Sequence, residues 1–112
     1  MDEKIYDIVF TESVSEFIDD MPESARRRLF FIVRKVEAGM ITDEIFKKLV
    51  GTNLWEFRVI AEKKHYRLFS FFDPQQKKII VACHAIMKKT QKTPKSAIAT
   101  AEKIREEYIK TK

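Results

Sequence analysis

Three runs of strand-forming residues follow one another in the second half of this chain and restrict it to folds built around an antiparallel sheet. The runs are Leu54–Ile60, Lys64–Phe72 and Lys78–Ile86, and each is rich in aromatic or β-branched side chains. Their connectors, EKK and DPQQK, are typical of hairpin turns. We therefore expect a three-strand antiparallel meander.

A strand and two helices are predicted before this meander. Ile5–Phe10 has the composition of a short strand, and Thr11 or Ser13 can cap the helix that follows. Pro22 suits the first turn of a second helix, which Gly39 would end. The apolar stripes of the two helices are Val14, Phe17, Ile18 and Met21, and Ala25, Leu29, Ile32, Val33 and Val36.

The C-terminal segment also has helical spacing. Thr93 is expected to cap a last helix with Pro94 in its first turn. Its apolar stripe is Ala97, Ile98, Ala101, Ile104 and Tyr108. Ile41–Val50 lacks clear periodicity and fits a loop with a turn of helix. The order predicts an α+β fold: an N-terminal strand, two helices, the three-strand meander and a C-terminal helix on one main sheet.

Length and composition favour one cytoplasmic domain over residues 1–112. No run of about 18 apolar residues is present, which argues against a membrane span. The acidic start, MDEKIYDIVF, does not resemble a secretory signal. Cys83 is the single cysteine and is expected to be a buried, reduced thiol. The sequence has no zinc-type spacing of Cys and His, no carboxylate metal cluster and no recognised nucleotide loop, so neither a metal nor another cofactor is expected.

Charge is distributed unevenly along the chain. Residues 1–23 carry eight acids and one lysine, whereas residues 24–112 carry nine acids and 21 Lys or Arg. Such asymmetry favours an anionic partner such as nucleic acid. The alternative is a layer of charge that only keeps the protein soluble.

Two arginines lie within strands that are otherwise largely apolar. Arg58 belongs to LWEFRVI and Arg67 to YRLFSFF. On paired strands, two guanidinium groups can project into one groove and bind a phosphate in bidentate fashion. The alternative is local ion pairing, because Glu56 lies two residues before Arg58 on the same strand face.

Lysines cluster where the third strand ends. Lys88 and Lys89 begin the segment KKTQKTPK, which also contains Lys92 and leads into the last helix. Lysine binds phosphate as a point charge, and a helix N-terminus adds to the positive field. Lys47 and Lys48 form a second pair shortly before Gly51. The alternative for both groups is a solvated basic loop.

Proton transfer has two candidates in the sequence, His84 and Glu56. His84 can act as an acid or base near neutral pH, although it is predicted to share a strand face with Ile80, Ala82 and Ile86 and can equally be a core residue. Glu56 can act as a base or merely orient Arg58. His65 lies near a hairpin and is expected to be exposed. Metal-free cleavage of RNA would need only such groups, because the ribose 2′-hydroxyl is the nucleophile.

Several of these motifs together resemble the RelE/ParE superfamily of bacterial toxins, and most of all its HigB-like, phage-related branch. The resemblance rests on K-x-L at Lys47–Leu49, LWEFR at Leu54–Arg58, YR at Tyr66–Arg67 and HAIMKKTQKTP at His84–Pro94, followed by an Ala-rich helix. It covers nearly the whole chain.

The resemblance implies a small α+β toxin whose sheet forms a basic cleft. Many members of the superfamily enter the ribosomal A site and cut mRNA without a metal, and a helix-turn-helix antitoxin silences them. The family's cleft positions correspond to Arg58, Arg67, Lys88 and Lys89, and less closely to His84 and Glu56. We therefore expect a cytoplasmic, ribosome-dependent mRNA endonuclease in which both arginines stabilise the scissile phosphate, with His84 or Glu56 moving protons.

Two other functions agree with the same sequence. One is a toxin that inhibits gyrase by binding it, like the ParE members of the superfamily. The other is an inactive phage remnant that only binds RNA. Neither would need catalytic groups.

Overall fold

The computed structural model describes residues 3–90 and 92–111 and has an α+β architecture built on a five-stranded mixed sheet. The elements in chain order are β1 (Asp7–Phe10), α1 (Glu12–Asp20), α2 (Glu23–Glu37), β2 (Phe46–Lys48), β3 (Trp55–Ala61), β4 (Lys64–Phe72), β5 (Ile79–Lys88) and α3 (Lys95–Lys110).

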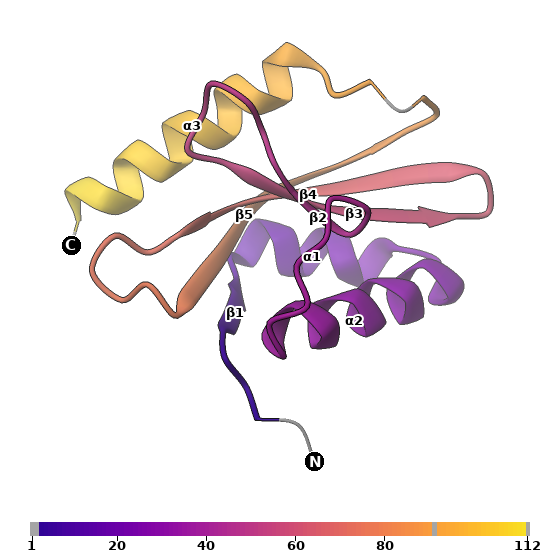
Figure 1. Ribbon diagram of the computed structural model, residues 1–112. Coiled ribbons are helices and arrows are strands. Elements are labelled where there is room, and N and C mark those ends of the chain that lie inside the picture. Colours follow the sequence, from indigo (N-terminus) through magenta and orange to yellow (C-terminus); the bar gives the residue numbers. More distant parts are fainter. Residues whose placement is uncertain (1–2, 91, 112) are drawn as a thin grey trace.

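Three layers make up the molecule, with the sheet in the middle. Helix α3 covers one face, and α1 and α2 cover the other (Figure 1). The strand order is β1-β5-β4-β3-β2, in which β1 pairs parallel to β5 and the other neighbours are antiparallel. The meander of β3, β4 and β5 confirms the central prediction from the sequence.

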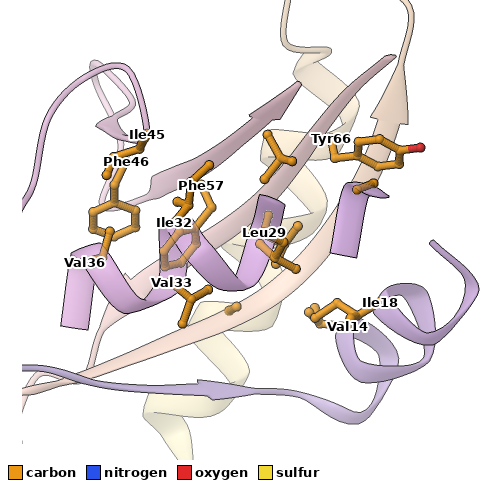
Figure 2. Packing of buried hydrophobic residues seen from close by; sticks show 14 of the residues in the cluster. Val14, Ile18, Leu29, Ile32, Val33, Val36, Ile45, Phe46, Phe57 and Tyr66 are labelled. Carbon is orange, nitrogen blue, oxygen red and sulfur yellow. The ribbon is translucent and has the colours of Figure 1, made fainter. Parts of the chain in front are cut away.

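Each face of the sheet has its own apolar core. On the lower face in Figure 1, the stripes of α1 and α2 pack against inward residues of the sheet such as Phe57 and Tyr66, and Figure 2 shows several of these side chains. On the other face, Phe69, Phe71 and Val81 pack against α3. Because strand side chains alternate between faces, successive residues of β4 enter different cores.

A β-bulge in β5 overturns one prediction about the faces of that strand. Ser70 pairs with Ala82, but Phe69 pairs with His84, so Cys83 is an extra residue without a partner on β4. The bulge interrupts the alternation of side chains. Ile80 and Ala82 therefore face α1 and α2, whereas His84 stacks on Phe69 on the α3 side. The prediction that His84 shares a face with Ile80 and Ala82 is wrong.

Two element boundaries also differ from those expected. The segment predicted as a loop with a turn of helix contains the short edge strand β2, which pairs with β3. The cap of α3 is Pro94 rather than Thr93, whose hydroxyl hydrogen-bonds elsewhere. By contrast, Gly39 ends α2 as predicted: it has a φ of +90°, and the amides of Gly39 and Met40 bond back to the last turn.

None of the helices in the described part of the chain combines the length and apolar character that crossing a bilayer requires.

Candidate functional site

Arg58 and Arg67 lie opposite each other on β3 and β4 and share one carboxylate. They are direct partners in the antiparallel register. The Nε atom of each arginine lies 3.6 Å from the same oxygen of Glu56, Oε1. The two guanidinium groups therefore converge on the α3 side of the sheet, and they are not held apart by separate acids.

This arginine cluster, which we define as Arg58, Arg67 and Glu56, is largely withdrawn from solvent. Arg67 has no exposed surface and Glu56 is 3% exposed, whereas the Arg58 side chain keeps 23%. Burying charges in a protein interior is costly unless they are paired and hydrogen-bonded. One carboxylate between two guanidinium groups leaves the cluster with excess positive charge.

Several N–H groups of the cluster lack hydrogen-bond acceptors. Nη1 of Arg58 donates to the Asp43 carbonyl at 3.2 Å, and Nη1 of Arg67 makes a long bond of 3.5 Å to the Tyr66 carbonyl. Within the described residues, Nε of both arginines and Nη2 of Arg67 are buried without an acceptor. Buried donors in this state each cost about 1–3 kcal/mol. An oxyanion is the kind of ligand that would satisfy them.

Lys88 and Thr93 extend the cluster from β5 toward α3. Lys88 Nζ donates to Thr93 Oγ1 at 3.3 Å, and Thr93 Oγ1 donates to Glu56 Oε2 at 3.2 Å. Burial lowers the pKa of Lys88, as do Arg67 and Arg58, while Glu56 raises it. Thr93 therefore belongs to the site and does not cap the helix. Its position in the sequence, within a lysine-rich run, did not indicate that it would contact Glu56.

His65 was expected to be exposed, but it is half-buried next to these cations. It pairs with Lys88 across β4 and β5, and it lies two residues before Arg67 on the same face of β4. Its Nδ1 atom is buried without a hydrogen bond among the described residues. Burial lowers the pKa of His65, and Arg67, Lys88 and Arg58 lower it further. Neutral imidazole is therefore the favoured form at pH 7.

His84 lies on the same side of the sheet but farther from the arginines. Its ring stacks on Phe69 at 6.0 Å, and Phe69 stands between it and Glu56 in the register. Burial lowers the pKa of His84. It lines a cavity of about 280 Å³ between β5 and the start of α3, together with Lys88 and Pro94. The bulge in β5 is what brings His84 to this side.

The family of the chain follows from a comparison with protein-family models. The model of phage-derived protein Gp49-like (DUF891) matches residues 16–106, which is most of the chain. The chain belongs to this Gp49-like family. The family is associated with toxin-like proteins, and the match includes all residues of the arginine cluster. No curated protein and no solved structure matches the chain.

The other lysines that were predicted to bind phosphate lie in two regions of this Gp49-like protein. Lys47 pairs with Glu56 and lies on the cluster's face of the sheet, at its edge. Lys48 pairs with Trp55 on the opposite face, and its Nζ donates to the Thr52 carbonyl at 2.7 Å. Lys89 and Lys92 are exposed between β5 and α3. The structure therefore separates Lys48 from the other predicted phosphate-binding residues.

The side chains that ligate metals do not gather in the described part of this Gp49-like chain. No three His, Cys, Asp or Glu residues there are placed to hold a metal ion together. The arginine cluster offers positive charge and unpaired N–H donors, and the neighbouring His65 adds a neutral imidazole.

Proposed function

We propose that this Gp49-like protein is a toxin of the RelE/ParE superfamily, HigB-like in type, that cleaves mRNA on the ribosome without a metal. The observation that carries the proposal is the pair of converging arginines with buried, unpaired N–H groups around a single carboxylate. Buried N–H donors without acceptors can bind an oxyanion, so this arrangement suits a site that receives a phosphate. Dependence on the ribosome rests on the resemblance of the sequence motifs.

The proposed reaction is attack by a ribose 2′-hydroxyl on the neighbouring phosphorus. The new O2′–P bond forms as the P–O5′ bond breaks, which gives a 2′,3′-cyclic phosphate and a free 5′-hydroxyl. Arg58 and Lys88 meet the phosphate first because Arg67 has no exposed surface. Arg67 binds it once the residues that cover its guanidinium group move aside. Each such contact to developing charge can contribute about 10²–10³ in rate.

Proton transfer in this proposal differs from the expectation based on the sequence. Glu56 is already engaged by two guanidinium groups and Thr93, so we assign it to positioning the arginines. His65, held neutral by its surroundings, accepts the proton of the 2′-hydroxyl. Lys88, whose pKa burial and neighbouring arginines lower, donates a proton to the leaving 5′-oxygen. His84 stays a candidate for contacts with the flanking nucleotide.

The test is brief induction of the protein alone, followed by pulse labelling and mapping of new RNA 5′ ends with and without translation. The wild type should stop protein synthesis and produce 5′-hydroxyl ends only on translated messages. Arg67→Ala should lose both effects, whereas Arg28→Ala, which removes an exposed arginine of α2, should retain them. A folded Arg67→Ala variant that still halts translation would refute the assignment. Failure of DNA synthesis before translation would instead indicate the gyrase-binding function.

A cognate helix-turn-helix antitoxin is part of the same proposal. It rests on the sequence resemblance, and the excess positive charge of the arginine cluster fits an acidic inhibitory segment. Co-expression of the neighbouring open reading frame should restore growth and co-purify with the protein.

A further inference from the structure

A second pocket that combines aromatic and basic residues lies at the far end of the sheet from His65 and Lys88. Its volume is about 420 Å³, which is in the range of small-molecule sites. Aromatic rings on its wall come from the segment before β1, from β3 and from β4, and cations come from β2, from the β4–β5 loop and from α3. These residues are Tyr6, Trp55 and Phe72, and Lys48, Lys77 and Arg105.

The aromatic wall is held in place by packing. Trp55 stacks on the buried Phe46 with ring centroids 5.1 Å apart, and Phe72 meets its edge at 5.6 Å. Tyr6 packs on Phe72 in turn at 5.7 Å. Trp55 nevertheless remains partly exposed toward the pocket. A fixed, half-exposed indole is a suitable surface on which a planar ring can stack, because little conformational entropy is lost on binding.

The charge of the pocket is unbalanced. Asp73 is its one acid, and its Oδ1 accepts the amides of Gln75 and Gln76 while its Oδ2 accepts the Tyr108 hydroxyl at 2.6 Å. Across the described residues, Lys48, Lys77 and Arg105 take part in none of the ion pairs. Lys77 comes from the β4–β5 loop and Arg105 from α3, so an anion between them would be held by two elements.

We propose that this pocket binds a nucleotide, with the base stacked on Trp55 and the phosphate held by Lys77 and Arg105. A flat ring attached to a dense negative charge is the ligand that matches an aromatic wall beside unpaired cations. The site is distinct from the arginine cluster: Trp55 faces the α1–α2 side, whereas Arg58 faces α3 and lies about 10 Å further along β3. The ligand is either a free nucleotide or a nucleotide of an RNA strand.

The edge strand β2 offers a route for such a strand. Lys47 lies on the face of the arginine cluster, and its neighbour Lys48 lies at the second pocket. An RNA that leaves the cluster over this edge would meet one cation on each side. This extension alone rests on the proposed function, whereas the pocket itself does not.

Trp55 is the only tryptophan, so its fluorescence reports on this pocket directly. AMP should quench it saturably, while adenosine and inorganic phosphate, each offering half of the ligand, should bind at least about tenfold more weakly. The double variant Lys77→Glu/Arg105→Glu should raise the apparent Kd for AMP by about tenfold or more. The matched control is Lys103→Glu, an exposed charge reversal on α3 outside the pocket, which should leave the Kd unchanged.

Arg58→Ala separates this proposal from the nuclease proposal. Quenching by AMP should persist in that variant even where RNA cleavage is lost. A 2′-O-methyl hexanucleotide, which cannot be cleaved, distinguishes the sources of the ligand: affinity well above that of AMP supports an RNA strand, and equal affinity supports a free nucleotide. Absence of saturable quenching up to about 10 mM AMP, or its loss in Arg58→Ala alone, would overturn the pocket as a nucleotide site.

Discussion

At the scale of single residues, Arg67 illustrates how the proposed anion site conflicts with stability. The side chain is fully buried, yet Nε and Nη2 have no hydrogen-bond acceptor in the described part of the chain. Its positive charge is only partly offset, because Arg58 competes for the same oxygen of Glu56. Replacement of a whole buried ion pair by apolar residues is often neutral or stabilising, whereas removal of one partner is costly when it leaves the other charge buried and unpaired. Without Arg67, Glu56 would still be paired with Arg58. Retention of such a residue is understandable if binding, and not stability, requires it.

We therefore expect Arg67→Met to abolish the proposed nuclease activity without loss of stability. Its free energy of unfolding should equal that of the wild type or exceed it by up to about 2 kcal/mol. Glu56→Gln is the informative counterpart, because it removes the only carboxylate between two arginines and should cost about 3 kcal/mol. Urea denaturation of the three proteins measures both effects. A loss of more than about 1 kcal/mol in Arg67→Met would contradict this interpretation.

Sequence reasoning found the arginine pair but missed His65 and Thr93. Arg58 and Arg67 stand out because charged residues are unusual in apolar strands. His65 lies two residues before Arg67, just as Glu56 lies two residues before Arg58. This spacing was the available signal that His65 shares a strand face with Arg67. Thr93 could not be recognised in this way, because its hydroxyl reaches Glu56, which is distant in the chain.

The lowered pKa of His65 predicts how the proposed cleavage depends on pH. A base must be neutral, and burial and three cations hold its pKa below the usual 6.5. Single-turnover cleavage should therefore stay constant as pH falls toward 6.5 and decline only below that value. His65→Gln should lower the rate by about 10²-fold and remove the decline, whereas His84→Gln should keep it. An unchanged pH profile in His65→Gln would exclude this residue as the base.

At the scale of elements, the strands that sequence patterns specify best are those with long alternating runs. The three strands of the meander were predicted with small errors at their ends. Strand β2 was missed because its three residues are too few to show alternation. The bulge at Cys83 was equally hidden, because nothing in an apolar run tells which residue lacks a partner. It nevertheless decides which face His84 occupies.

The end of α2 supports a prediction about Gly39. Gly39 has a backbone φ of +90°, and a Cβ atom added there would lie 2.7 Å from Cδ1 of Ile5. Gly39→Ala should cost about 1–2 kcal/mol of unfolding free energy. Gly51→Ala is the matched control: its φ is also positive at +77°, but nothing lies within 4 Å, so only the backbone term applies. The urea denaturation midpoints of the two variants, compared at equal m-values, measure both losses of unfolding free energy. A loss in Gly51→Ala that equals or exceeds the loss in Gly39→Ala would contradict the proposed contact with Ile5.

At the scale of the whole molecule, the two faces of the sheet are covered unequally. Helix α2 buries five side chains of its stripe, whereas the buried side chains of α3 are only those of Ala97 and Ala101. Part of the attachment of α3 is polar, through the 2.6 Å bond from Tyr108 to Asp73. Because apolar burial provides most of the stability of packed helices, α3 should detach more readily than α1 and α2. Its N-terminal end adjoins Lys88 and Thr93, so such openings would also affect the arginine cluster.

Cys83 can measure this detachment, because it lies in the core beneath α3. The thiol is 1% exposed, and burial raises its pKa to about 12, so the native protein should resist alkylation at pH 8. Labelling should proceed through opening of α3 at a free energy below that of global unfolding. Tyr108→Phe removes the bond to Asp73 and should speed labelling about fivefold, whereas Tyr66→Phe, on the opposite face, should not. If both variants label only at the rate of global unfolding, α3 does not open as an independent unit, and access to the cluster must arise from the segment around Thr93 instead.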